Sequence, residues 1–106
     1  MVKNTIGRQP TVEFVLHKKN GGLGLSIVAA RGSGQAEFGI YIKSVVPGGA
    51  AHDDGRLVSG DLLVAVDNTS LHGLTQDRAA DVMRKTGDTV KVGFIINLFL
   101  IIFNYF

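Results

Sequence analysis

The segment GLGLSIV at residues 22–28 places a leucine between two glycines and then runs directly into residues that favour a β-strand. Glycine permits a tight backbone path that turns successive N–H groups toward one side, and such a group of donors binds an anion. We therefore expect Leu23 to Leu25 to form a nest for a carboxylate, with the two leucines forming an apolar pocket below it. Taken alone, the same letters also fit a glycine-rich hairpin turn with core leucines.

Segments with the alternating pattern of half-buried strands lie on both sides of this stretch. Before it, Val12, Phe14 and Leu16 share one face of a strand predicted at residues 11–17. The other strands are predicted at residues 25–30, 38–46, 62–66 and 89–94. Turns are expected at residues 18–22, at residues 31–37 and at Asn68, because asparagine tolerates a positive φ.

One full helix is predicted at residues 76–85, with Thr75 as its N-cap and Gly87 as its C-terminal stop. A short helical turn is expected at residues 50–53. Together with the strands, these helices predict a mainly β (α+β) fold. We expect this fold to be a small antiparallel β-sandwich or β-barrel of five to six strands, with one full helix and one short helix.

The full helix uses two of its faces, at about 100° per residue. The face toward the sheet carries Ala79, Val82 and Thr86 and is expected to belong to the core. The second face carries a polar, a small and a flexible side chain in a row, as the wall of a groove would: Gln76, Ala80 and Met83.

The length and composition limit the classes of function. The 106 residues have room for one domain of about 100 residues, which excludes a second, catalytic domain. The absence of cysteine excludes disulfides, thiolate nucleophiles and cysteine-based zinc sites, and a cytosolic setting fits best. The net charge of +2 is spread along the chain without a basic cluster, so we expect no nucleic-acid partner.

Three segments, in the right order and spacing, resemble the signatures of PDZ domains: GLGLSIV at 22–28, GRLVSGDLL at 55–63 and LTQDRAA at 74–80. The resemblance implies a PDZ-like domain over residues 11–94, with no catalytic residue, cofactor or metal. Such a module binds the free C-terminal tail of a partner by strand addition beside residues 25–29, in the groove between the second strand and the main helix. The site residues implied are Lys18, Gly22, Leu23, Gly24, Leu25, Ser26, Ile27, Gln76, Ala80 and Met83.

Within the family, SIVAA at 26–30, GIY at 39–41 and QDRAA at 76–80 are most similar to PDZ domains of the afadin type, which belong to cell-junction scaffolds. This narrower resemblance implies a cytoplasmic scaffold at cell–cell junctions, on the inner face of the plasma membrane. Its partners would be C-terminal tails of membrane receptors, nectin-type adhesion proteins in particular.

Two residues of the implied site leave their roles open. Gln76 stands where many family members carry a histidine that selects a ligand Ser or Thr, so we expect an apolar (class II) or dual preference instead. Lys18 stands where the family often has a basic residue that supports the bound carboxylate. Lys18 and Lys19 also fit a solvated surface pair.

Other patterns lack the context that their chemistry needs. The pair Gly22 and Gly24 has no third glycine at dinucleotide-binding spacing, and a strand rather than a helix follows it. His17, His52 and His72 occur without a nucleophile elbow or a paired histidine on one helix. We therefore predict solvated histidines rather than an enzyme or a metal site.

The two ends of the chain differ from the segment between them. Residues 1–10 lack the apolar stretch of a signal peptide, and we expect a disordered N-terminal tail. Residues 95–106 contain only Ile, Asn, Leu, Phe and Tyr, a run shorter than the roughly 20 apolar residues of a membrane span.

This hydrophobic extension departs from the family, whose last strand ends near residues 93–95. Three interpretations stay open: sequence from beyond the domain, an extra strand, or a membrane-contacting segment. The alternative function is therefore a structural or membrane-associated small β domain that self-associates through its hydrophobic extension.

Overall fold

The strands form one sheet in the order β1-β6-β4-β3-β2, with β5 paired to β4, and every strand pair is antiparallel. The computed structural model describes residues 11–31 and 38–96. In chain order its elements are β1 (Val12–His17), β2 (Leu25–Ala30), β3 (Gly39–Val45), α1 (Ala50–Asp54), β4 (Leu62–Val66), β5 (Thr69–Ser70), α2 (Gln76–Arg84) and β6 (Thr89–Ile95). The predicted antiparallel β fold with one full and one short helix is confirmed.

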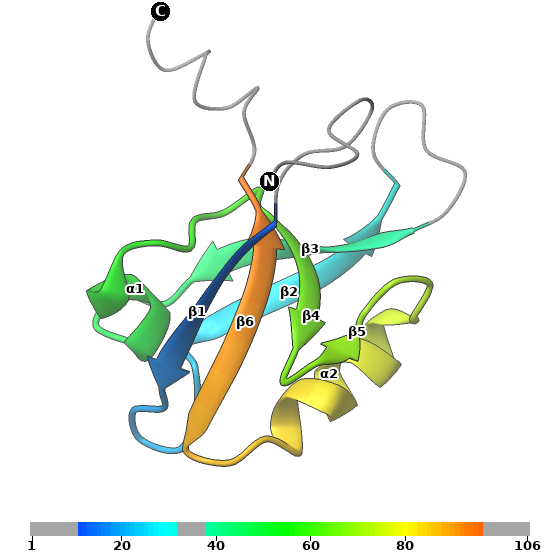
Figure 1. Ribbon diagram of the computed structural model, residues 1–106. Helices are drawn as coiled ribbons and strands as arrows, with labels where there is room; N and C mark the ends of the chain where they lie inside the picture. The colour runs from blue at the N-terminus through cyan, green and yellow to red at the C-terminus, as the bar shows by residue number, and fades with distance from the viewer. Residues whose placement is uncertain (1–10, 32–37, 97–106) are drawn as a thin grey trace, which may run out of the picture.

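The sheet is curved into two layers, with β1, β6 and β4 crossing in front of β3 and β2 (Figure 1). The helix α1 contacts β1, and α2 contacts β2. Because β2 is the last strand of the sheet order, one of its edges faces α2 rather than another strand. This open edge is the feature of the fold on which the site depends.

The core lies between the two layers and follows the alternation of the strands. Phe14 and Leu16 of β1 and Ile40 and Ile42 of β3 are buried, as their period of two predicts. The ring of Phe14 meets that of Phe94 edge to face at 5.4 Å between centroids. Val12 lies on the same face of β1 but remains 37% exposed, because it begins the strand at the margin of the core.

The predicted element bounds agree with the structure to within one residue at each end, and those of β2 and β4 agree fully. The two-residue strand β5 was not predicted, since so short a pairing leaves no periodic pattern. Asn68 has the expected positive φ, 67°, and the preceding Asp67 also has a positive φ, 49°. Two successive left-handed residues therefore make the turn from β4 into β5.

The start of α2 is as predicted and its end lies one residue before the predicted bound, but Gly87 does not have the predicted role. Thr75 accepts a hydrogen bond from the Arg78 N–H at 3.2 Å, so its role as N-cap is confirmed. Gly87 is not the C-terminal stop, because its φ is not positive. The helix ends earlier, at Arg84, and the Thr86 hydroxyl donates to a carbonyl of the last turn, that of Met83, at 2.7 Å.

The expectations for the two ends of the chain concern mainly residues outside those described. The predicted tail at 1–10, most of the loop at 31–37 and the extension from residue 97 lie there. Ile95, which we assigned to the extension, instead ends β6 and pairs with Leu62. In the part of the chain that the structure describes, neither helix is long and apolar enough to cross a membrane.

The buried edge-to-face pair predicts how the fold responds to core truncation. Phe94 is 1% exposed, so Phe94→Ala should lower the free energy of unfolding by about 3 to 5 kcal/mol. The matched control is Val15→Thr on the adjacent strand, where Val15 is 45% exposed and the change should stay within about 0.5 kcal/mol. Urea denaturation measures both, and equal losses would contradict the assigned core.

Candidate functional site

The loop between β1 and β2 begins with a tight hairpin. Lys19 and Gly22 exchange two backbone hydrogen bonds of 2.9 and 3.2 Å. Between them, Asn20 and Gly21 have φ values of 55° and 81°, and two such residues in succession form the turn that an Asn-Gly pair favours. This hairpin fixes where the glycine segment starts.

Three successive carbonyl groups of that segment are bound from behind. The Gly22 carbonyl accepts from the Lys19 N–H at 2.9 Å, that of Leu23 from Ala51 at 2.9 Å, and that of Gly24 from Val46 at 2.8 Å. In a trans peptide unit the C=O and the following N–H point in opposite directions. The N–H groups of residues 23–25 therefore point away from these partners.

The first two of these donors have no backbone acceptor. Within the described ranges, neither Leu23 nor Gly24 donates its N–H to another backbone group. Leu25 and Val45 form a non-hydrogen-bonded pair of the antiparallel ladder, because the neighbouring Val46 N–H donates to the Gly24 carbonyl. Its own N–H thus faces the open edge of β2.

Gly24 is held against the turn before α1. It has a φ of 74°, and a Cβ built on it would lie 2.9 Å from the Cα of Gly49. This close approach brings the glycine segment within hydrogen-bonding distance of Val46 and Ala51. A side chain at position 24 would disturb the peptide units that carry the donors.

A charged side chain joins the hairpin to the same turn. The Lys19 Nζ donates to the Gly48 carbonyl at 2.9 Å and to the Asp53 carboxylate at 2.8 Å. The hydrogen bond from Lys19, with the attraction of its charge, holds the pKa of Asp53 below its usual value. Asp53 therefore stays ionised at neutral pH and keeps this contact, although an exposed ion pair adds little stability by itself.

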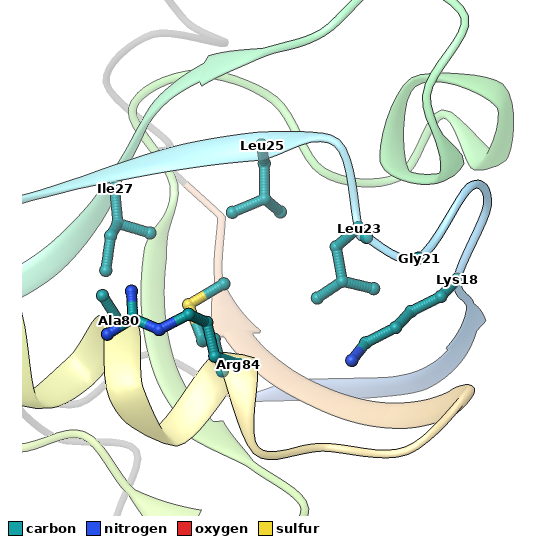
Figure 2. Close-up of a pocket in the computed structure, with 9 residues that line it drawn as sticks. Lys18, Gly21, Leu23, Leu25, Ile27, Ala80 and Arg84 are labelled. Carbon is teal, nitrogen blue, oxygen red and sulfur yellow. The ribbon is translucent and has the colours of Figure 1, made fainter.

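A pocket of about 290 Å³ opens on the donor side of the loop. Figure 2 shows Leu23, Leu25 and Ile27 facing into it, with Ala80 on the helix side. Its walls combine the hairpin, the edge strand β2 and one face of α2: Lys18, Gly21, Gly22, Leu23, Leu25, Ile27, Ala80, Met83 and Arg84. Gly21 and Arg84 are not among the predicted site residues.

The structure thus brings together seven of the ten predicted site residues and places the other three elsewhere. Gly24 lies behind the pocket against Gly49. The Ser26 hydroxyl lies 2.6 Å from that of Ser44 on β3, since residues 25 and 26 point to opposite faces of the strand. Gln76 contacts β2 itself, through a 3.0 Å hydrogen bond from the Ala29 N–H to its side-chain oxygen.

Two cations stand at the pocket, and both have partners. The Lys18 Nζ donates to the Thr86 carbonyl at 2.8 Å, which joins the hairpin to the end of α2. Arg84, which follows Met83 in the last turn of α2, pairs with Asp81. The Asp81 carboxylate offsets the charge of Arg84, whereas the partner of Lys18 is a neutral carbonyl, so the positive charge of Lys18 favours an anion at the pocket.

Comparison with known proteins gives a consistent result. A model of the PDZ domain family matches residues 13–95. Neurabin-2 of Homo sapiens is 49% identical over 79 residues, which are 72% of this chain and 10% of that protein. The human multiple PDZ domain protein is 38% identical over 90 residues, which are 85% of this chain and 4% of that protein. The chain spans a tenth or less of the length of these relatives.

Solved structures agree with these relatives. The second PDZ domain of Dlg1 from the choanoflagellate Monosiga brevicollis matches with a TM-score of 0.73 at 30% identity. The match covers 83% of this chain and 100% of that domain.

The close approach of Gly24 to Gly49 predicts a difference between two glycines that share the left-handed region. Gly48 has a φ of 81° and open space around a Cβ, so Gly48→Ala should cost only the left-handed strain, about 1 to 2 kcal/mol. Gly24→Ala should cost about 1 to 3 kcal/mol more, because its Cβ meets the backbone. Urea unfolding of both variants measures this, and equal costs would contradict the contact.

Proposed function

The chain belongs to the PDZ domain family of protein-interaction modules, and on this premise we propose that it binds the free C-terminal end of a partner protein as a strand added beside β2. The observation that carries the proposal is the orientation of three peptide units: the carbonyls of Gly22, Leu23 and Gly24 are bound from behind. Their N–H groups then converge on a ligand carboxylate at the mouth of the pocket.

The pocket below these donors takes the side chain of the last ligand residue. Its walls at Leu23, Leu25 and Met83 are apolar, and an apolar side chain gains about 1.5 to 3 kcal/mol on full burial. A carboxylate bound by N–H donors adds charge-assisted hydrogen bonds of about 1.5 to 3 kcal/mol each. A tail ending in Val, Leu, Ile or Phe satisfies both parts at once.

The ligand runs antiparallel to β2, because its last residue lies beside Leu25 at the start of the strand. Its next contacts then lie along the open edge toward Ala29, with the side chains of alternate residues facing α2. The residue two before the end meets Ile27 and Ala80, an apolar and a small side chain. We propose a preference for a bulky apolar residue there, with Ser or Thr second.

The partners that we propose are C-terminal tails of membrane receptors. The resemblance to afadin-type PDZ domains at residues 26–30 and 76–80 supports nectin-type adhesion proteins among them. A scaffold role on the inner face of the plasma membrane at cell–cell junctions follows from that resemblance. An array of free C-terminal peptides tests the partner class independently of the groove geometry.

The carboxylate nest predicts that the ligand needs a free acid. Replacing the terminal carboxylate of a Leu-ending peptide by a carboxamide removes the charge and should weaken binding roughly 10- to 100-fold. Isothermal titration calorimetry of the matched acid and amide peptides measures the difference. Equal affinities would contradict the assignment of Leu23 to Leu25 as the carboxylate site.

The apolar surroundings of the ligand residue two before the end predict that a histidine at position 76 changes the selectivity there. Gln76→His introduces an imidazole that hydrogen-bonds a ligand hydroxyl, so the preference two residues before the end should move from apolar residues toward Ser and Thr. A peptide array read with both proteins measures the shift. A wild-type protein that accepts only Ser or Thr at this position would refute the proposed selectivity.

A further inference from the structure

The open edge of β2 offers its backbone groups at alternate residues. The Ala29 N–H points away from β3, since it donates to Gln76 on α2 at 3.0 Å. Residues two apart on a strand point their backbone groups to the same side, so Ile27 and Leu25 share this direction. The edge therefore has three outward positions, of which Ala29 is the farthest from the glycine loop.

Gln76 is fixed in place to make this contact. It is the first residue of α2, and the Thr75 cap with its 3.2 Å bond from Arg78 determines where the helix begins. The sheet register fixes Ala29 opposite Ile40. The side chain therefore crosses from helix to strand between two positions that the fold holds independently.

From this contact we infer that Gln76 weakens the backbone pairing of a ligand beside Ala29, because it competes for one of the two hydrogen bonds that an antiparallel strand makes there. The inference rests on the proposed function and its antiparallel register. Counting the last ligand residue as position 0, positions 0, −2 and −4 lie beside Leu25, Ile27 and Ala29. Gln76 accepts from the Ala29 N–H, so the position −4 carbonyl receives no hydrogen bond from β2, whereas the Ala29 carbonyl can still accept from the position −4 N–H.

The competition at Ala29 favours the side chain over the ligand. Both acceptors are amide oxygens and make chemically equivalent hydrogen bonds. The Gln76 oxygen is already tethered beside the N–H, whereas a ligand residue at position −4 must be ordered to reach it. The domain consequently pairs most strongly with the ligand backbone at positions 0 and −2, and its pairing at position −4 lacks the hydrogen bond from the Ala29 N–H.

Amide-to-ester substitution tests this inference at one carbonyl at a time. The probe is the N-acetylated hexapeptide Ala-Ala-Ala-Phe-Ala-Leu with a free acid. Lactic acid in place of alanine at position −3 turns the position −4 carbonyl into an ester, a weaker acceptor. Lactic acid at position −1 does the same to the position −2 carbonyl, which faces Ile27 and serves as the internal control.

The wild-type protein should bind the position −4 ester and the parent peptide within twofold. In Gln76→Ala the Ala29 N–H is released, and the same ester should bind about fivefold more weakly than the parent peptide. Gln76→Glu keeps an acceptor oxygen and should behave as the wild type. The position −2 ester should lose about fivefold in all three proteins.

Amide hydrogen exchange of Ala29 in the free protein provides a readout that needs no ligand. The amide should be protected in the wild type and in Gln76→Glu and should exchange faster in Gln76→Ala. Equal exchange in all three would overturn the inference even if no peptide binds, which is how failure of the proposed function would appear. A position −4 ester that weakens binding to the wild type, or that leaves Gln76→Ala unaffected, would also overturn it.

Discussion

The site depends on hydrogen bonds made behind it, to the carbonyls of Gly22, Leu23 and Gly24. A peptide unit whose carbonyl is bound on one side presents its N–H on the other. Because the partners are the backbone N–H groups of Lys19, Ala51 and Val46, the direction of the donors is set by hydrogen bonds between backbone groups. The donor part of the site is therefore built from backbone and needs residues that allow this backbone path, whereas the pocket beside it is lined by side chains.

The rest of the fold brings those partners into position. Ala51 lies in α1 and Val46 follows β3, and both approach the loop only because Gly24 and Gly49 let two backbones meet. The sheet order leaves β2 at an edge, and α2 lines that edge without pairing with it. The result is a groove with donors at one end, an apolar pocket beside them and an open strand edge leading away.

Local sequence signals predicted most of the helices and strands and seven of the residues that line the pocket. Alternation placed Phe14, Leu16, Ile40 and Ile42 in the core, and the Thr75 cap fixed the start of α2. The role predicted for Gly87 was wrong, because a glycine near a helix end suggests a left-handed stop that Gly87 does not make. Capping by the Thr86 hydroxyl competes with that signal and is not visible in composition.

Contacts between distant segments were beyond prediction from the sequence. Nothing local links Gly24 to Gly49, Lys18 to the carbonyl of Thr86 or Gln76 to Ala29, since each depends on the register of the folded sheet against α1 or α2. Arg84 was missed for a related reason. The helical stripe through Ala80 and Met83 predicted an apolar wall, and a long charged side chain at its margin is normally assigned to solvent.

The most direct test of the account is the backbone amide spectrum of the loop during titration with a Leu-ending peptide. The account predicts that the amide protons of Leu23, Gly24 and Leu25 move strongly downfield with the free acid, as charge-assisted hydrogen bonds form, and little with the carboxamide. Shifts concentrated elsewhere, for example along β1 at the opposite edge of the sheet, with these three amides unchanged, would contradict it.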